Sequence, residues 1–303
     1  MTRGMTRLQA DLLLTVVAII WGSAFVFQAQ GMEALGPMAF TGVRFLLGAL
    51  VVLPLALWEQ PRRKAASRAK PMTPAVLVLG ALMLTGAGFQ QIGIQTTTVT
   101  NAGFLTALYV PLVPLLAALV LKESPHWSVW PCALACVGGA FLLSGAHTLS
   151  FNTGDLWVLA STLPWAAHVL WVGRLADRFD APFSVACGQF AVVGVLALAY
   201  AVVAEPFTLA QVIQVWPAVA FTGICSVGLA FTAQVVAQRH AQASDAAIIL
   251  SSETLFAALF GYWLLDERLS TLGLLGCGLI LFALLAVQLL PLLHPSFKRS
   301  HAA

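Results

Sequence analysis

Ten apolar runs, each about twenty residues long, follow one another along the 303-residue chain. An α-helix needs about that length to cross the hydrocarbon core of a bilayer. Only 9% of the residues are charged, whereas a water-soluble chain needs about 25% to cover its surface. The sequence therefore predicts an all-α polytopic membrane protein with ten transmembrane helices, at residues 11–29, 37–57, 74–94, 101–121, 127–145, 155–174, 183–203, 216–236, 245–264 and 271–291.

Lysine and arginine are unevenly distributed between the two sides of these spans. With both termini in the cytoplasm, 13 of the 15 basic residues fall in cytoplasmic segments, five of them in the linker 59–72. Arg268 alone lies in an outer loop, and Arg44 lies within a span. Positive residues favour the cytoplasmic side, where they meet anionic lipid headgroups. We therefore expect a multi-pass protein of the bacterial inner (plasma) membrane with both termini cytoplasmic, a lipid bilayer as its surroundings, and no nucleic-acid partner.

The chain repeats itself at an offset of 144 residues. The offset pairs Asp11 with Asp155, Trp21 with Trp165, and Glu123 with Glu267. The repeat divides the chain into halves 1–145 and 146–303, each with five predicted spans. An odd number of spans places the second half upside down relative to the first. The sequence thus predicts two inverted five-helix repeats, an arrangement typical of transporters that bind their substrate near the midplane.

Several short motifs recur in the expected order. They are Trp21-Gly22-Ser23-Ala24-Phe25-Val26, Pro37, Arg44-Phe45, Pro111-Leu112, Leu121-Lys122-Glu123, the stretch from Ser252 to Gly261, and Asp266-Glu267-Arg268-Leu269. Together they resemble the drug/metabolite transporter superfamily, EamA type, over almost the whole chain. Thr254 departs from the proline that the family often has there. The resemblance implies ten helices around a central cavity and export of small metabolites or drugs from the bacterial cytoplasm. The amino-acid exporters resemble the chain most.

Charged residues inside a membrane are costly, at least about 2.5–3.5 kcal/mol each on insertion scales, and therefore indicate function. Glu253 lies near the middle of the ninth span. It is a protonatable coupling group, a contact for a cationic substrate amine, or a structural glutamate tied to Ser251, Ser252 or nearby backbone. Arg44 lies about 10 Å inside the second span. It either extends towards the interface or pairs with a carbonyl group, or it is a gate contact or a ligand for a substrate carboxylate.

Large side chains gather on the sixth span. At 100° per residue, Trp165, His168 and Trp171 fall within about 120° of arc. Tryptophan suits a cavity that is apolar on one edge and wet on the other, and its ring attracts ammonium groups. We expect Trp165 and His168 to line the cavity, whereas Trp171 fits the interfacial belt better.

Polar and aromatic residues on other spans complete the predicted substrate site. Gln91 and Gln234 match at an offset of 143, and such a pair suits a site on the pseudo-symmetry axis. Their alternative role is hydrogen bonding between helices. The predicted substrate-binding residues are Trp165, His168, Gln91, Gln234, Tyr109, Phe89, Asn101 and Trp21.

Prolines predict bending points. Pro111 and Pro114 interrupt the fourth span, whereas the equivalent positions in the second half hold Leu255 and Ala258. Proline removes a backbone donor and bends a helix, so only the first of these two helices is expected to break. Pro164 is a further predicted hinge, in the sixth span. A static kink at any of these prolines is the alternative.

Other classes of function lack their motifs. Neither a Gly-x-Ser-x-Gly elbow nor a His-Glu-x-x-His motif occurs, and no polar loop recurs as in a channel filter. The five cysteines lack metal-site spacing, and no phosphate-binding loop is present, so no metal and no cofactor are expected. The sequence predicts a secondary transporter that exports a small-molecule substrate, an amino acid above all, with drugs or other metabolites as the alternative. It is compatible with a monomer.

Overall fold

The computed structural model describes residues 5–97, 99–123, 127–143, 152–265 and 270–293, and within these ranges all regular structure is helical. The all-α fold class is thereby confirmed. The first half contains α1 (Arg7–Gly31), α2 (Pro37–Glu59), the 3₁₀ turn η1 (Gln60–Arg62), α3 (Ala65–Arg68), α4 (Thr73–Ile94), α5 (Val99–Ala107), α6 (Tyr109–Leu121) and α7 (Val129–Leu143). The second half contains α8 (Thr153–Phe179), α9 (Pro182–Ala204), α10 (Leu209–Gln214), α11 (Trp216–Ala220), the π-helix η2 (Phe221–Phe231), α12 (Thr232–Ala237), α13 (Ala243–Leu250), α14 (Glu253–Leu265) and α15 (Thr271–Leu293).

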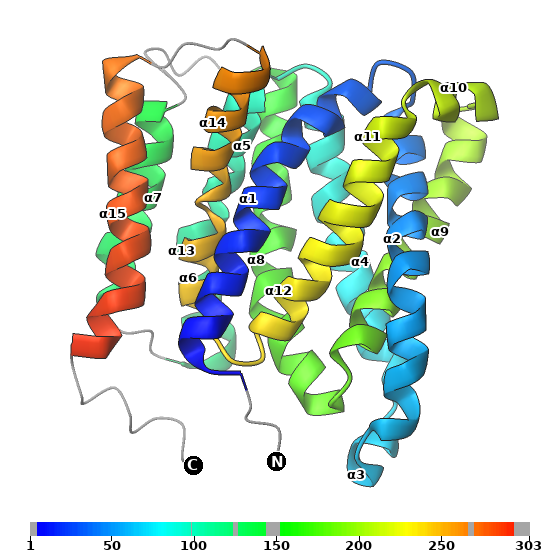
Figure 1. Ribbon diagram of the computed structural model, residues 1–303, viewed down its shortest axis with the longest axis horizontal. Helices are drawn as coiled ribbons and strands as arrows, with labels where there is room; N and C mark the ends of the chain where they lie inside the picture. The colour runs from blue at the N-terminus through cyan, green and yellow to red at the C-terminus, as the bar shows by residue number, and fades with distance from the viewer. Residues whose placement is uncertain (1–4, 98, 124–126, 144–151, 266–269, 294–303) are drawn as a thin grey trace.

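Eight helical segments of the described residues are long and apolar enough to cross a membrane. Each of them overlaps one of the predicted spans. The two remaining predicted spans, 127–145 and 271–291, correspond to shorter apolar helices at Val129–Leu142 and Thr271–Ala283. These two pack side by side at one end of the molecule, as α7 and α15 (Figure 1). The count of ten crossings therefore stays a prediction.

The two ends of the described chain lie on the same side of the bundle. Figure 1 shows α1 beginning and α15 ending at the face that also carries α3. We call it the terminal face, defined by Arg7, Arg68 and Leu293. An even number of crossings brings both ends to one face. The compartment that this face meets stays a prediction.

Helices α2 and α9 cap each other at both ends. The carboxylate of Glu59, the last residue of α2, accepts hydrogen bonds from the backbone N–H of Phe183 at 3.2 Å and of Ser184 at 2.8 Å, in the first turn of α9. Glu205, just past α9, accepts in the same way from Met38 at 2.8 Å and Ala39 at 3.0 Å, in the first turn of α2. The two matching helices are therefore antiparallel, as the predicted inversion requires.

Removing either cap should destabilise the protein. A helix start has backbone N–H groups without intrahelical partners, and its dipole attracts a carboxylate. Hydrogen bonds to a charged group contribute about 1.5–3 kcal/mol, so Glu59→Ala and Glu205→Ala should each lower the free energy of unfolding by about 2 kcal/mol. Chemical denaturation in mild detergent measures this. Glu33→Ala is the control, because Glu33 is exposed. Equal stability of all three variants would contradict the reciprocal capping.

Both repeats contain a broken helix at the same position. The first break, at Leu108, lies between α5 and α6, and Pro111 explains it, because the missing N–H leaves the carbonyl of Ala107 without its helical donor. The second break, at Ser251 and Ser252, lies between α13 and α14. The expectation that only the first of these helices would break is therefore wrong.

Hydroxyl groups explain the second break. Ser251 Oγ donates to the carbonyl of Ile248 at 2.8 Å, and Ser252 Oγ donates to that of Ile249 at 2.6 Å. Such bonds offer carbonyl groups an alternative to the helical ladder. By contrast, α8 continues as an α-helix through Pro164. The hinge roles of the prolines stay predictions.

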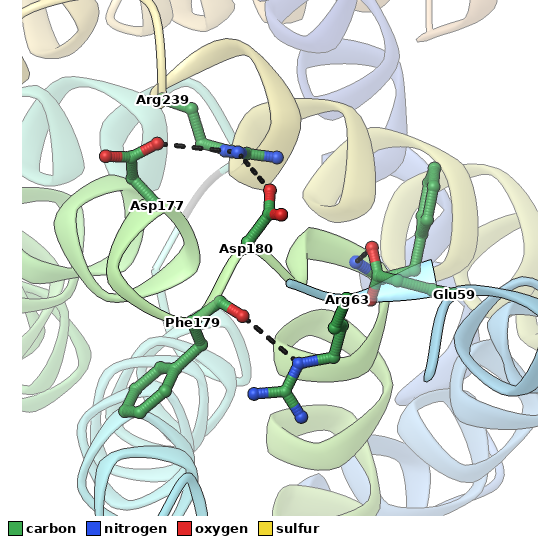
Figure 2. A network of polar contacts seen from close by, with 7 residues as sticks. Glu59, Arg63, Asp177, Phe179, Asp180 and Arg239 are labelled. Carbon is green, nitrogen blue, oxygen red and sulfur yellow. Dashed lines mark hydrogen bonds and ion pairs between the residues drawn. The ribbon is translucent and has the colours of Figure 1, made fainter. Parts of the chain in front are cut away.

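A polar network joins several helix ends at the terminal face (Figure 2). Arg63 Nε donates to the carbonyl of Phe179 at 3.1 Å, which holds the segment after α2 against the end of α8. Arg239, just past α12, pairs with Asp180 at 3.0 Å and with Asp177 at 3.4 Å. The network therefore connects the ends of α2, α8 and α12.

The backbones of α8 and α12 also approach each other closely at this face. A methyl group at Gly173 would lie 2.3 Å from the carbonyl oxygen of Gln238. Gln238 in turn donates to the carbonyl of Val169 at 2.9 Å. In the first half of the chain, Glu33 and Gln95 are equivalent to Asp177 and Arg239. No bond joins Glu33 to Gln95 among the residues that the structure describes, whereas Arg239 pairs with Asp177. The contacts that join the helix ends therefore differ between the two faces of the bundle.

Candidate functional site

A cavity of about 50 Å³ lies between the two repeats. Its walls come from α1, α2, α4, α5, α6, α8, η2, α12 and α14. The lining residues are Trp21, Phe25, Gln28, Arg44, Ala87, Gln90, Thr106, Tyr109, Trp165, Val169, Ser226, Phe231, Gln234 and Glu253. The bundle therefore surrounds a small chamber with polar, charged and aromatic walls.

Ten of these fourteen residues form five pairs at the 144-residue offset. The pairs are Trp21 with Trp165, Phe25 with Val169, Ala87 with Phe231, Gln90 with Gln234, and Tyr109 with Glu253. Equivalent residues of two inverted repeats come together only near the axis that relates the repeats. The chamber, which we call the axial cavity, is therefore built on the pseudo-two-fold axis.

The two helix breaks supply one of these pairs. Tyr109 is the first residue of α6 and Glu253 is the first residue of α14, so each follows its break directly. The Tyr109 hydroxyl donates to the carbonyl of Ala247 at 3.4 Å, just before the second break. Irregular backbone at membrane depth is tolerated where it is enclosed by protein or lines a polar cavity. The breaks thus bring two polar side chains to the axial cavity.

One basic and one acidic side chain line the axial cavity without pairing with each other. Arg44 is 3% exposed and Glu253 is 5% exposed. Among the described residues, neither side chain forms an ion pair. The Arg44 guanidinium lies 5.2 Å from the ring centre of Phe45 and 5.5 Å from that of Phe40. These aromatic contacts stabilise the cation partly, but they provide no hydrogen-bond acceptor.

Four neutral or charged groups of the cavity wall lack hydrogen-bond partners within the described part of the chain. The donors are Arg44 Nε and Trp165 Nε1, and the acceptors are Gln28 Oε1 and Gln234 Oε1. Gln90 differs, because its amide donates to the hydroxyl of Thr106 at 2.8 Å. Buried polar groups are almost always hydrogen-bonded in folded proteins. Four of the thirteen such atoms among the described residues belong to this one wall, which favours a site for a polar ligand.

Aromatic rings hold the cavity wall together. Phe231 lies 4.4 Å from Trp21 and 5.7 Å from Trp165, measured between ring centres, and stacks on Trp165 with an interplanar angle of 14°. Gly86 leaves the space that the Trp165 indole fills, because a methyl group there would lie 2.9 Å from Cδ2. One phenylalanine thus contacts both equivalent tryptophans.

Six residues singled out from the sequence meet at the axial cavity, and others do not. The six are Trp21, Arg44, Tyr109, Trp165, Gln234 and Glu253. His168 is not among the lining residues and shares a hydrogen bond of 2.9 Å with Gln189 of α9. Gln91 is fully buried elsewhere, with no bond to its amide from the described residues, and Phe89 packs on Trp157 at 5.0 Å. Trp171 packs on the core, and the side chain of Asn101 lies outside the described residues.

The lining residues that sequence reasoning missed are mostly symmetry partners. Gln90, rather than Gln91, matches Gln234 at the full offset of 144. The same offset pairs Phe25 with Val169 and Ala87 with Phe231, so these could have been found from the repeat. Gln28, Thr106 and Ser226 had no such signal in the sequence.

A second, more polar cavity of about 680 Å³ opens at the terminal face. Arg174, Asp177, Gln238 and Ser244 are among the residues that line it. Val169 borders both this cavity and the axial cavity. The described residues include no cluster of three metal-ligating side chains. The second cavity therefore approaches the axial cavity from the terminal face.

Comparisons with known proteins agree with this architecture. The chain is 33% identical over 294 residues to an uncharacterized transporter of Archaeoglobus fulgidus, covering 94% of this chain and 88% of the relative. It is 23% identical over 287 residues to the uncharacterized inner membrane transporter YedA of Escherichia coli, with 93% and 92% covered. The crystal structure of another protein shares the fold, with a TM-score of 0.77 at 20% identity over 94% of this chain and 98% of the other.

The sequence profile of the EamA-like transporter family matches this chain twice, at residues 8–145 and 152–289. The two matches are themselves displaced by 144 residues, which is the offset of the cavity pairs. The chain is therefore a multi-pass membrane protein with two repeats, and it belongs to the EamA-like transporter family.

Proposed function

We propose that this protein exports amino acids from the bacterial cytoplasm by alternating access through the axial cavity. The family makes it a transporter. The substrate class, the direction and the mechanism are inferred from the cavity and from the charges of the loops. The terminal face, with most of the basic residues, is the cytoplasmic one in this proposal.

The observation that carries the substrate class is the set of unpartnered polar groups around one cavity. Arg44 and Trp165 offer unpartnered donors, and Gln28 and Gln234 offer unpartnered acceptors. Glu253 adds a carboxyl group to the same wall. An amino acid has an α-carboxylate for the donors and an α-ammonium for the acceptors. Such a ligand satisfies both buried charges at once, and leaving either charge unpaired in a low-dielectric site is costly.

The same argument ranks the alternative substrates. A cationic drug would pair with Glu253 but leave Arg44 without an anion. A neutral metabolite would leave both charges unpaired. A zwitterion matches the net charge of the cavity wall, to which the described lining residues contribute one cation and one carboxylate. Amino acids are the commonest metabolites of this kind.

The unequal fastening of the two faces supports alternating access. The contacts of Arg239 and Gly173 hold α8 and α12 together at the terminal face, while the equivalent positions Glu33 and Gln95 are not joined. Inverted repeats that differ in this way can exchange their conformations, which exposes a midplane site to each side in turn. Gly173, Asp177 and Arg239 also line the polar cavity at the terminal face, and Val169 lies between that cavity and the axial cavity. In this proposal their contacts close the cytoplasmic route, and the route opens when α8 and α12 separate.

Flux measurements in liposomes test the proposal. Purified protein is reconstituted, and uptake of radiolabelled neutral amino acids is compared with that of the matching primary amine, which lacks the carboxylate, and of the N-acetyl derivative, which lacks the ammonium. We expect saturable flux of the amino acid and at least a roughly tenfold lower rate for each analogue, since each loses a charged hydrogen bond. Protein-free liposomes are the control. Non-saturating flux, or equal flux of all three compounds, would contradict a zwitterion carrier.

A further inference from the structure

Trp21 and Trp165 are equivalent residues, yet their indole N–H groups have different surroundings. Trp21 Nε1 donates to the backbone carbonyl of Ser226 at 3.3 Å. Trp165 Nε1 is buried and has no acceptor among the residues that the structure describes. Both rings line the axial cavity and both contact Phe231. The difference therefore comes from the helices that face them.

The π-helix explains why only Trp21 finds an acceptor. Ser226 lies in the middle of η2, whose hydrogen bonds span five residues and make a wider turn than those of an α-helix. A carbonyl oxygen has two lone pairs, and a wider turn leaves the second one accessible to a neighbouring helix. The residue equivalent to Ser226 is Leu82, which lies in α4, a regular α-helix. The Trp165 indole faces this regular helix and receives no such acceptor from it.

The Trp165 ring is nevertheless held in place. Gly86 of α4 lies against one part of the indole, so closely that a methyl group would lie 2.9 Å from Cδ2, and Phe231 stacks on it. The side chain is 9% exposed. Buried N–H groups without partners are rare in proteins. A buried donor that is held in place beside a cavity and lacks an acceptor is suited to donate to a bound ligand.

A second donor on the same cavity has the same property. Arg44 Nε is buried without a hydrogen-bond partner among the described residues. Together the two donors are suited to the two oxygens of a carboxylate. Glu253 and the free amide oxygens of Gln28 and Gln234 are suited only to a group that donates.

We propose that the Trp165 indole N–H, together with Arg44, binds the carboxylate of the substrate, and that Trp21 has a structural role, holding η2 against α1 through Ser226. This assignment rests on the proposed function, because it requires a substrate with a carboxylate. Two residues that are equivalent in the sequence repeat thus have different roles. Trp165 then determines specificity and Trp21 does not.

The matched variants Trp165→Phe and Trp21→Phe test this division. Each removes one indole N–H and the same volume. A hydrogen bond to a charged group corresponds to a roughly 10- to 100-fold change in affinity. We expect Trp165→Phe to raise KM for the amino acid by that factor and to change inhibition by the matching primary amine less than about threefold. Trp21→Phe should change KM for the amino acid and inhibition by the amine by the same factor, because it removes no carboxylate donor, and it should lower the melting temperature.

Several outcomes would overturn the assignment. Equal increases in KM for the two variants would do so, as would an effect of Trp165→Phe that is the same for the amino acid and for the amine. Gly86→Ala is a second test if Trp165→Phe fails to fold, because its methyl group should displace the indole and raise KM for the amino acid selectively. If the wild-type protein carries no amino acid at all, the proposed function fails instead, and the two failures are distinguishable.

Discussion

Neutralising either charge of the axial cavity, by Arg44→Gln or Glu253→Gln, should lower amino-acid flux roughly 10- to 100-fold without destabilising the protein. Each charge contributes a hydrogen bond to the charged end of the substrate, which is worth about 1.5–3 kcal/mol. Neither side chain, however, has an ion-pair partner among the described residues. A buried unpaired charge is unfavourable, so its removal should leave the free energy of unfolding unchanged or raise it.

The test is sharp because the flux should fall while the free energy of unfolding does not. Flux into liposomes and chemical denaturation are measured on the same preparations. Lys122→Gln is the control, because Lys122 is exposed and lies outside the cavity. A structural role for Glu253 in joining helices predicts instead that Glu253→Gln unfolds more easily than the wild type and transports normally once folded. That result would remove Glu253 from the substrate site.

Replacing Gly22 with leucine should abolish transport and prevent most of the protein from folding. Gly22 lies where α1 meets α14, and even a methyl group there would lie 2.6 Å from Phe256 Cβ, 2.7 Å from the Ala257 nitrogen and 2.7 Å from the Glu253 carbonyl oxygen. Two of these atoms belong to the backbone, so a side chain cannot be accommodated by a change of rotamer. Overpacking costs about 1–3 kcal/mol in cores that relax. At Gly22 a leucine side chain would fit only if α1 and α14 moved apart.

Two glycines provide matched controls for the Gly22 variant. A methyl group at Gly138 or Gly278 would meet nothing within 4 Å among the described residues. Gly138→Leu and Gly278→Leu should therefore fold and transport like the wild type. Gly22→Ala should be intermediate, with a lower melting temperature and at least a several-fold lower flux. Size-exclusion chromatography and flux measure both properties. A Gly22→Leu protein that elutes and transports normally would show that α1 and α14 do not need their close contact.

The order of helices could be predicted because hydropathy is a local property of the sequence. Each predicted span overlaps a helix, and the 144-residue repeat was visible in a few pairs such as Trp21 and Trp165. The break at Ser251 and Ser252 could not be predicted in the same way. Hydroxyl groups disrupt a helix only when they turn back to carbonyl groups of their own helix, and this choice depends on the neighbouring helices.

The cavity could be predicted only in part, because a helical wheel gives directions but not neighbours. Trp165 and His168 share one side of α8, yet Trp165 meets α4 and the cavity whereas His168 meets Gln189 of α9. An error of one residue separated Gln91 from the lining residue Gln90. Equally, no sequence pattern indicated that η2 is a π-helix, on which the different surroundings of the two tryptophans depend.

The mutual capping of α2 and α9 has a consequence for motion. A helix pair joined at both membrane surfaces, with Glu59 at one end and Glu205 at the other, resists tilting and sliding of one helix against the other. Spin labels on these two helices should keep a constant separation throughout the transport cycle, while labels on α8 and α12 change theirs. Helices α2 and α9 would then stay fixed relative to each other during transport. The remaining helices would rotate about this pair, and their rotation would open the cavity to one side of the membrane or the other.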